Sequence, residues 1–130
     1  MTEIHTTAVL RSSERVIAGT TVVALRGEID LLTAQPLSAR LDMLTAGPRP
    51  DVVLDLCSVS FIDCAGLGVL CRAQNRTANR HGRLRLVTSG TGFLRILRHA
   101  QLGGVFETHT RLPNALAAKP ESGDTSATAG

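Results

Sequence analysis

A short apolar run followed by an acid and two glycines constrains the fold of this chain more than any other feature. The run Val52–Leu56 is rich in β-branched residues and too brief for a helix, so it predicts a strand buried on both faces. Asp63 then stands in a capping position before a helical pattern from about Ala65 to Asn79. Free N–H groups at such a helix start attract oxyanions, so we place the candidate functional site at this junction.

The rest of the chain alternates between strand and helix patterns after an opening hairpin. The hairpin is predicted to turn at Ala18-Gly19-Thr20, and Thr33 is predicted to cap a helix with Pro36 in its first turn. The helix should bury Leu37, Leu41 and Leu44 on one face and end at Gly47-Pro48. In chain order the predicted elements are strands 14–19 and 21–26, the helix after Thr33, strand 51–57, the helix from Ala65, strand 83–87, helix 92–100, strand 105–107 and helix 112–118.

This order predicts one α/β domain over residues 1–118, with a mixed sheet of about five strands packed with about four helices. Residues 119–130 contain Pro, Glu, Ser, Gly, Asp, Thr and Ala, which bury little apolar surface, and they are predicted to form a disordered tail.

Three motifs together resemble those of the STAS domain of bacterial anti-sigma factor antagonists. They are Gly27-Glu-Ile-Asp30 followed by Thr33-Ala34, then Phe61-Ile-Asp63-Cys64-Ala65-Gly66-Leu67-Gly68, and then Leu97-x-x-x-x-Leu102-Gly103 before a strand at Val105-Phe106. Their order and spacing agree with the family, whereas Asp-x-x-Gly alone would carry no information. The resemblance implies a small domain that binds a serine-kinase-type anti-sigma factor and so frees a sigma factor for transcription.

The residue that matches the family's phosphorylation position is Ala65. The resemblance implies that the kinase phosphorylates a Ser or Thr at this position in regulated members, and that the phosphorylated form releases its partner. Alanine has no oxygen to accept a phosphoryl group, so that switch cannot operate at this residue. The resemblance also implies a neighbourhood around the position that comprises Asp30, Thr33, Asp63, Cys64 and Gly66. Asp30 and Asp63 can equally be ordinary turn or cap residues.

On a helical wheel, the helix from Ala65 has a core face and a face with little side-chain bulk at its start. The core face is predicted to hold Leu67, Leu70, Cys71 and Ala78. The other face is predicted to hold Ala65, Gly68, Val69, Arg72 and Arg76. Small residues, Gly66 among them, would let another backbone approach, Val69 would add an apolar contact, and the two arginines would meet acidic groups. The spacing also fits an ordinary exposed face, and the family resemblance favours a partner-binding one.

The cysteines and histidines do not predict a metal site or a bound cofactor. Cys57, Cys64 and Cys71 are evenly spaced, but Cys57 ends a strand and Cys71 is predicted to point to the core. The four histidines, His5, His81, His99 and His109, have no metal-ligand spacing. A thiol at a helix start, such as Cys64, can be reactive, although Asp63 opposes the thiolate, so a redox role and inert packing both remain open.

Composition and charge reduce the classes of partner that we expect for this protein. The net charge of +3 is carried by arginines spread along the chain, with Lys119 the single lysine, and there is no Trp or Tyr on which bases would stack. A solvated basic face or an acidic protein partner therefore explains the charge better than nucleic acid. The chain has no apolar run of about 18 residues and no signal-peptide pattern, which predicts a cytoplasmic protein without a membrane partner.

Two functional hypotheses follow from the sequence. The first is an anti-sigma factor antagonist that Ala65 holds permanently in the state equivalent to the unphosphorylated form. The second is a non-switching STAS scaffold or ligand sensor, with Cys64 as a possible thiol sensor. An enzyme is not expected, because the sequence contains no catalytic constellation, and Asp30 and Asp63 are not supported as a general acid and base pair. We expect a monomer or a weak homodimer.

Overall fold

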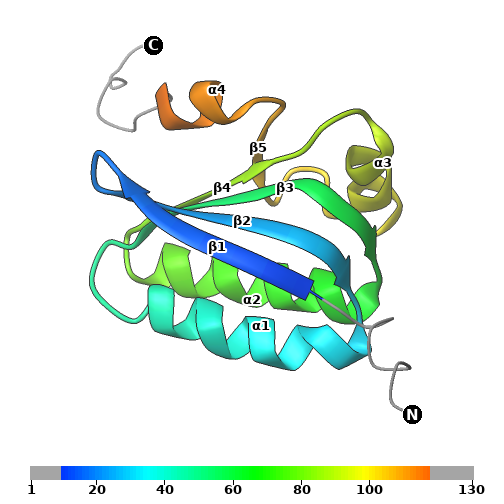
Figure 1. Ribbon diagram of the computed structural model, residues 1–130, viewed down its shortest axis with the longest axis horizontal. Helices are drawn as coiled ribbons and strands as arrows, with labels where there is room; N and C mark the ends of the chain where they lie inside the picture. The colour runs from blue at the N-terminus through cyan, green and yellow to red at the C-terminus, as the bar shows by residue number, and fades with distance from the viewer. Residues whose placement is uncertain (1–9, 118–130) are drawn as a thin grey trace.

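A computed structural model describes residues 10–117, and within them the chain forms five strands and four helices (Figure 1). The strands are β1 (Leu10–Ile17), β2 (Thr20–Ile29), β3 (Asp51–Ile62), β4 (Arg83–Val87) and β5 (Glu107–His109). The helices are α1 (Leu31–Leu44), α2 (Cys64–Asn79), α3 (Gly92–His99) and α4 (Leu112–Ala117). The predicted fold class is confirmed. The predicted tail, 119–130, lies outside the described residues.

The sheet has the order β1-β2-β3-β4-β5, with β1 antiparallel to β2 and the other neighbours parallel. The hairpin turn is confirmed: Ala18 and Gly19 both have positive φ, 52° and 86°, as a two-residue turn that follows the strand twist requires. Helices α1 and α2 lie side by side on one face of the sheet, and α4 lies on the opposite face (Figure 1).

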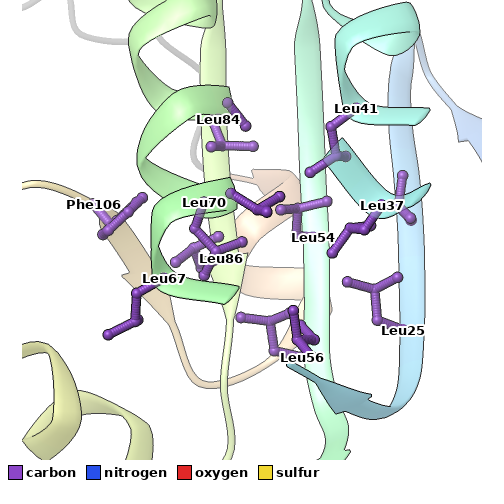
Figure 2. Close-up of a cluster of buried hydrophobic side chains, with 14 of the residues drawn as sticks. Leu25, Leu37, Leu41, Leu54, Leu56, Leu67, Leu70, Leu84, Leu86 and Phe106 are labelled. Carbon is purple, nitrogen blue, oxygen red and sulfur yellow. The ribbon is translucent and has the colours of Figure 1, made fainter. Parts of the chain in front are cut away.

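The main core lies between the sheet and the pair α1 and α2 (Figure 2). Leu54 and Leu86 from the sheet and Leu70 from α2 are completely buried there, and Leu41 of α1 is 1% exposed. A smaller cluster on the other face gathers Ala115 of α4 against three valines of the sheet, Val22, Val53 and Val87. Both faces of the central strands are therefore buried. This explains why three apolar residues, Val52 to Leu54, follow one another without a polar residue between them.

Helix α1 differs from its prediction at its start. Asp30, not Thr33, is the N-cap residue, and its side chain accepts hydrogen bonds from the N–H groups of Leu32 and Thr33. The Thr33 hydroxyl accepts from the Asp30 N–H in return, so the two residues form a reciprocal capping box. Because the helix starts at Leu31, Pro36 lies beyond the first turn, where it removes the N–H that would bond the Leu32 carbonyl.

Strand β3 is longer than predicted, and β5 begins two residues later. Pairing with β4 ends at Asp55, but pairing with β2 continues to Ile62 through register shifts on both sides of Gly27. Gly27 has a φ of 116°, which side chains disfavour, so this glycine allows the irregular pairing. The strand therefore carries the chain directly to Asp63.

Candidate protein-binding site

The site is built where the carboxyl ends of β2 and β3 lie side by side. Ile29 pairs with Ile62 in the parallel register, and the N–H of Asp63 donates to the carbonyl oxygen of Ile29 at 3.1 Å. Each strand then passes through an aspartate into a helix, so Asp30 and Asp63 meet at one edge of the sheet. The sequence predicted these two acids for one neighbourhood, and the structure brings them together.

Both acids act as helix caps in this structure. Asp63 is the N-cap residue of α2, and its carboxylate accepts a hydrogen bond from the N–H of Gly66 at 3.0 Å. Asp30 does the same for α1. A carboxylate at a helix start also lies at the positive end of the helix dipole, which stabilises its charge. The sequence had left this cap role open as the alternative, and the hydrogen bonds establish it.

Thr33 belongs to the framework of the site and not to its surface. It is 7% exposed, and its hydroxyl donates to the carbonyl oxygen of Glu28 at 2.8 Å while accepting from the N–H of Asp30 at 2.9 Å. Burial and these bonds leave the hydroxyl little access to another protein.

Gly66 fits tightly against the ends of the two strands. A Cβ at this position would lie 2.6 Å from Cγ1 of Ile62, 2.7 Å from Cγ2 of Ile29 and 2.7 Å from the carbonyl oxygen of Ile29. The expectation that Gly66 makes room for another protein is wrong, because the space it leaves is filled by its own sheet. Its lack of a side chain lets α2 begin in close contact with β2 and β3.

The exposed part of the α2 start comprises Cys64, Ala65 and Gly68. Cys64 and Gly68 are exposed, Ala65 is half-buried, and a Cβ on Gly68 would meet no atom within 4 Å. The prediction that this part of the helix has little bulk toward solvent is confirmed at Gly68. We refer to Cys64, Ala65 and Gly68 as the α2 start face.

Two positions on α2 were predicted on the wrong side. Val69 is 8% exposed and belongs to the core, so it supplies no apolar contact to a partner, whereas Ala78 is exposed. Val69 is buried because α2 packs against α1 as well as the sheet, which widens the buried stripe beyond the one that the helical wheel predicts. Ala78 lies near the end of α2. Cys71 is half-buried against the core.

Arg72 and Arg76 bind a neighbouring helix. Arg72 holds the carboxylate of Asp42 on α1 with two hydrogen bonds, at 3.0 and 2.9 Å. Arg76 donates to the carbonyl oxygen of Asp42 at 3.0 Å and to the hydroxyl of Thr45 at 3.1 Å. The hydrogen bonds from Arg72 hold the pKa of Asp42 below its ordinary value. Both arginines therefore tie α1 to α2, and Arg72 remains the more exposed of the two.

Sequence reasoning missed the apolar side chains around the α2 start face. Leu31 and Leu32 are 77% and 71% exposed, and Phe61 is 50% exposed, although all three lie beside the two caps. The sequence held a signal for the two leucines. In a helix that starts at Leu31, the buried stripe begins with Thr33 and Ala34, so Leu31 and Leu32 lie outside that stripe. Exposed large apolar side chains are typical of a protein-binding surface.

The three cysteines do not form a shared metal site within the described residues. Cys57 and Cys64 are exposed, and no group of three or more His, Cys, Asp or Glu side chains within residues 10–117 is arranged to hold a metal ion. Partial desolvation raises the pKa of the Cys57 thiol, and the neighbouring carboxylate of Asp55 raises it further. His5 lies outside the described residues.

Comparison with known proteins agrees with this fold. The family model described as Mlab, STAS domain, matches residues 14–112. The chain belongs to the STAS domain family. It is 30% identical to the anti-sigma-F factor antagonist RsfA of Mycobacterium tuberculosis over 100 residues. The matched region covers 75% of this chain and 77% of RsfA.

Solved structures of STAS proteins share the fold. An anti-sigma factor antagonist from Mycobacterium paratuberculosis superimposes with a TM-score of 0.77 at 27% identity, over 85% of this chain and 94% of that one. The anti-sigma factor antagonist SpoIIAA in its unphosphorylated form gives a TM-score of 0.63 at 14% identity, over 82% and 94% of the two chains, and shows the fold alone. Among the described helices of this STAS domain, none has the length and apolar character needed to cross a membrane.

Proposed function

We propose that this STAS protein is an anti-sigma factor antagonist that binds a serine-kinase-type anti-sigma factor and so frees a sigma factor for transcription. The observation that carries the proposal is the exposed surface at the carboxyl ends of β2 and β3, where the paired residues Ile29 and Ile62 lead into the exposed Leu31 and Leu32 of α1 and into the α2 start face. The likeness to RsfA supports the class of partner. The test is copurification with an ATPase-type anti-sigma factor, and its failure would favour the scaffold or sensor hypothesis.

The contact surface that we propose has small residues at its centre and apolar ones at its margin. At Ala65 and Gly68 a partner backbone can come close, because neither residue has a side chain that would block it. Leu31 and Leu32 would then lose water-exposed apolar area on binding, which favours association. Arg72 lies one turn beyond Gly68, where it can meet an acidic group while still bonded to Asp42.

Ala65 holds the proposed antagonist in one state. The domain offers no acceptor oxygen at this position, and the nearest alternative in the neighbourhood, Thr33, is buried in the capping box. Ser58 and Ser60 on β3 are exposed hydroxyls, although Ser60 donates to the carbonyl oxygen of Gly27 at 3.2 Å. Binding should therefore be controlled by the amounts of the proteins and not by phosphorylation at Ala65.

The absence of phosphorylation at the α2 start is directly testable. Incubation with the cognate kinase and ATP should leave this protein without phosphate at the junction, whereas Ala65→Ser should gain one phosphate, because the hydroxyl then stands at the helix start. Mass spectrometry of the intact protein and of its peptides measures both. Phosphate on Ser58 or Ser60 of the unmodified protein would show that the switch has moved along the strand, and the proposed single state would be wrong.

Charge at the α2 start face should weaken partner binding. Ala65→Asp imitates part of the charge of a phosphoserine, and Gly68→Arg fills the open space above the helix. We expect each variant to lower the affinity for the anti-sigma factor at least tenfold, about 1.4 kcal/mol, in isothermal titration. Gly68→Arg is a cleaner probe than Arg72→Glu, because the latter also breaks the ion pair with Asp42.

Matched controls for these variants lie farther along the same helix. Ala78 is exposed near the end of α2, off the face that holds Gly68 and Arg72, so Ala78→Asp and Ala78→Arg introduce the same charges away from the proposed contact. Both should bind like the parent. A folded Ala65→Asp protein, verified by circular dichroism, that binds as tightly as the parent would place Ala65 outside the interface.

A further inference from the structure

A cleft of about 290 Å³ opens where β3 runs past the end of β4. The pairing of these strands stops at Asp55 and Val87, while β3 continues to Ile62. The first turns of α3 close the other side of the gap. The cleft thus lies at the carboxyl end of parallel strands, where α/β sheets commonly hold ligands, and its volume is at the lower end of small-molecule sites.

The walls of the cleft are mostly apolar, with no charged side chain among its described lining residues. Phe61 from β3 and Phe93 and Ile96 from α3 line it, and Phe61 and Ile96 stay 50% and 38% exposed, respectively. None of the 11 described residues that line it carries an acidic or basic side chain, and partial desolvation raises the pKa of the Cys57 thiol, which keeps that lining group neutral. The lining offers no cationic side chain to pair with an anion, and the start of α3 would offset only about 0.3 to 1 kcal/mol of the cost of burying one, so the walls favour a neutral occupant.

Thr88 places an unpaired hydroxyl in this cleft. The residue is 2% exposed, and its N–H donates to the carbonyl oxygen of His109 at 2.9 Å, but Oγ1 has no hydrogen-bond partner. Buried hydroxyls nearly always have a partner, because leaving one unpaired is costly. Thr88 lines the cleft, so a group placed in the cleft can supply the missing hydrogen bond.

The start of α3 adds further donors. Its N-cap residue, Thr91, makes no side-chain cap hydrogen bond, and the first two helical residues, Gly92 and Phe93, line the cleft. The first N–H groups of a helix have no partner within the helix. A hydroxyl that can donate and free N–H groups therefore border the same apolar space. They match the oxygen of a carbonyl group.

We propose that this cleft binds a small neutral molecule with an apolar body and one carbonyl oxygen, which accepts hydrogen bonds from the Thr88 hydroxyl and the start of α3. The apolar body covers Phe61 and Ile96. The proposal goes beyond anti-sigma factor binding and does not depend on it, because the walls, the hydroxyl and the helix start all belong to this chain.

The test is a titration of the isotope-labelled protein with 2-heptanone, followed by amide chemical shifts. We expect shifts confined to residues 57–62 and 88–96, and at least tenfold weaker binding of heptanoate, which has the same number of carbons but carries a charge. Thr88→Val keeps the shape and removes the hydroxyl, so it should stay folded and bind the ketone about three- to tenfold more weakly. Thr110→Val, at an exposed position outside the cleft, should bind like the parent.

A second variant keeps the test independent of the hydroxyl. A Cβ on Gly92 would meet no atom within 4 Å, so Gly92→Leu should fold, fill part of the cleft and abolish the localised shifts. The proposal is overturned if 2-heptanone produces no localised shifts, if heptanoate binds equally well, or if both Thr88→Val and Gly92→Leu bind like the parent. In the first case, a protein partner becomes the better candidate to cover Phe61 and Ile96.

Discussion

Replacing Arg85 by alanine is expected to lower the free energy of unfolding by about 3 kcal/mol. Arg85 is completely buried on β4, where Nη1 donates to the carbonyl oxygen of Ala115 at 2.6 Å and Nη2 pairs with the carboxylate of Asp51. The substitution removes the donor that holds α4, leaves Asp51 without its cation and opens a cavity. Since the Asp51 side chain is 30% exposed, water can offset part of the loss.

A urea titration measures this effect, with Arg85→Met as the matched control. Methionine fills much of the same volume but supplies no charge or donor, so we expect it to lose about half as much stability as alanine. The Thr20 hydroxyl, which donates to Asp51 at 2.8 Å, remains in both variants and keeps that carboxylate partly satisfied. If Arg85→Ala unfolded at the same urea concentration as the parent, Arg85 would not hold α4 to the sheet.

The burial of Arg85 shows what the sequence could not predict. Strand 83–87 is predicted correctly from its alternation, and alternating strands usually have one solvated polar face. Here that face is covered by α4, a helix of six residues that was predicted but could not be placed on the sheet. Periodicity describes one element at a time, whereas the burial of an arginine depends on which element packs over it.

The junction between β3 and α2 shows the same difference between features that depend on local sequence and features that depend on packing. Asp63 as a cap, the helix that follows it and the open position Gly68 all depend on local sequence, and all three are observed. The burial of Val69 and the exposure of Leu31 depend on how α1 and α2 lie against each other and where α1 begins. Local rules therefore located the candidate site, while the exposure of Leu31 and Leu32 depended on the residue at which α1 begins.

Gly66 and Gly68 should respond to alanine with opposite signs, although they are two residues apart on α2. At Gly66 the new Cβ would lie 2.7 Å from the carbonyl oxygen of Ile29, so the helix start or the strand end must shift, and we expect a loss of about 2 to 3 kcal/mol. At Gly68 the Cβ would meet no atom within 4 Å, and the better helix propensity of alanine should add about 0.5 to 1 kcal/mol.

Urea denaturation of the two alanine variants gives this comparison, and each serves as the control for the other. Equal stability of Gly66→Ala and the parent would contradict the close contact between α2 and the ends of β2 and β3. A confirmed loss would assign the glycine of Asp63-x-x-Gly66 to the framework, since it sets the helix against the sheet and thereby presents Ala65 to solvent. Weak partner binding by a Gly66 variant would then report a displaced helix, whereas weak binding by a Gly68 variant would report the contact itself.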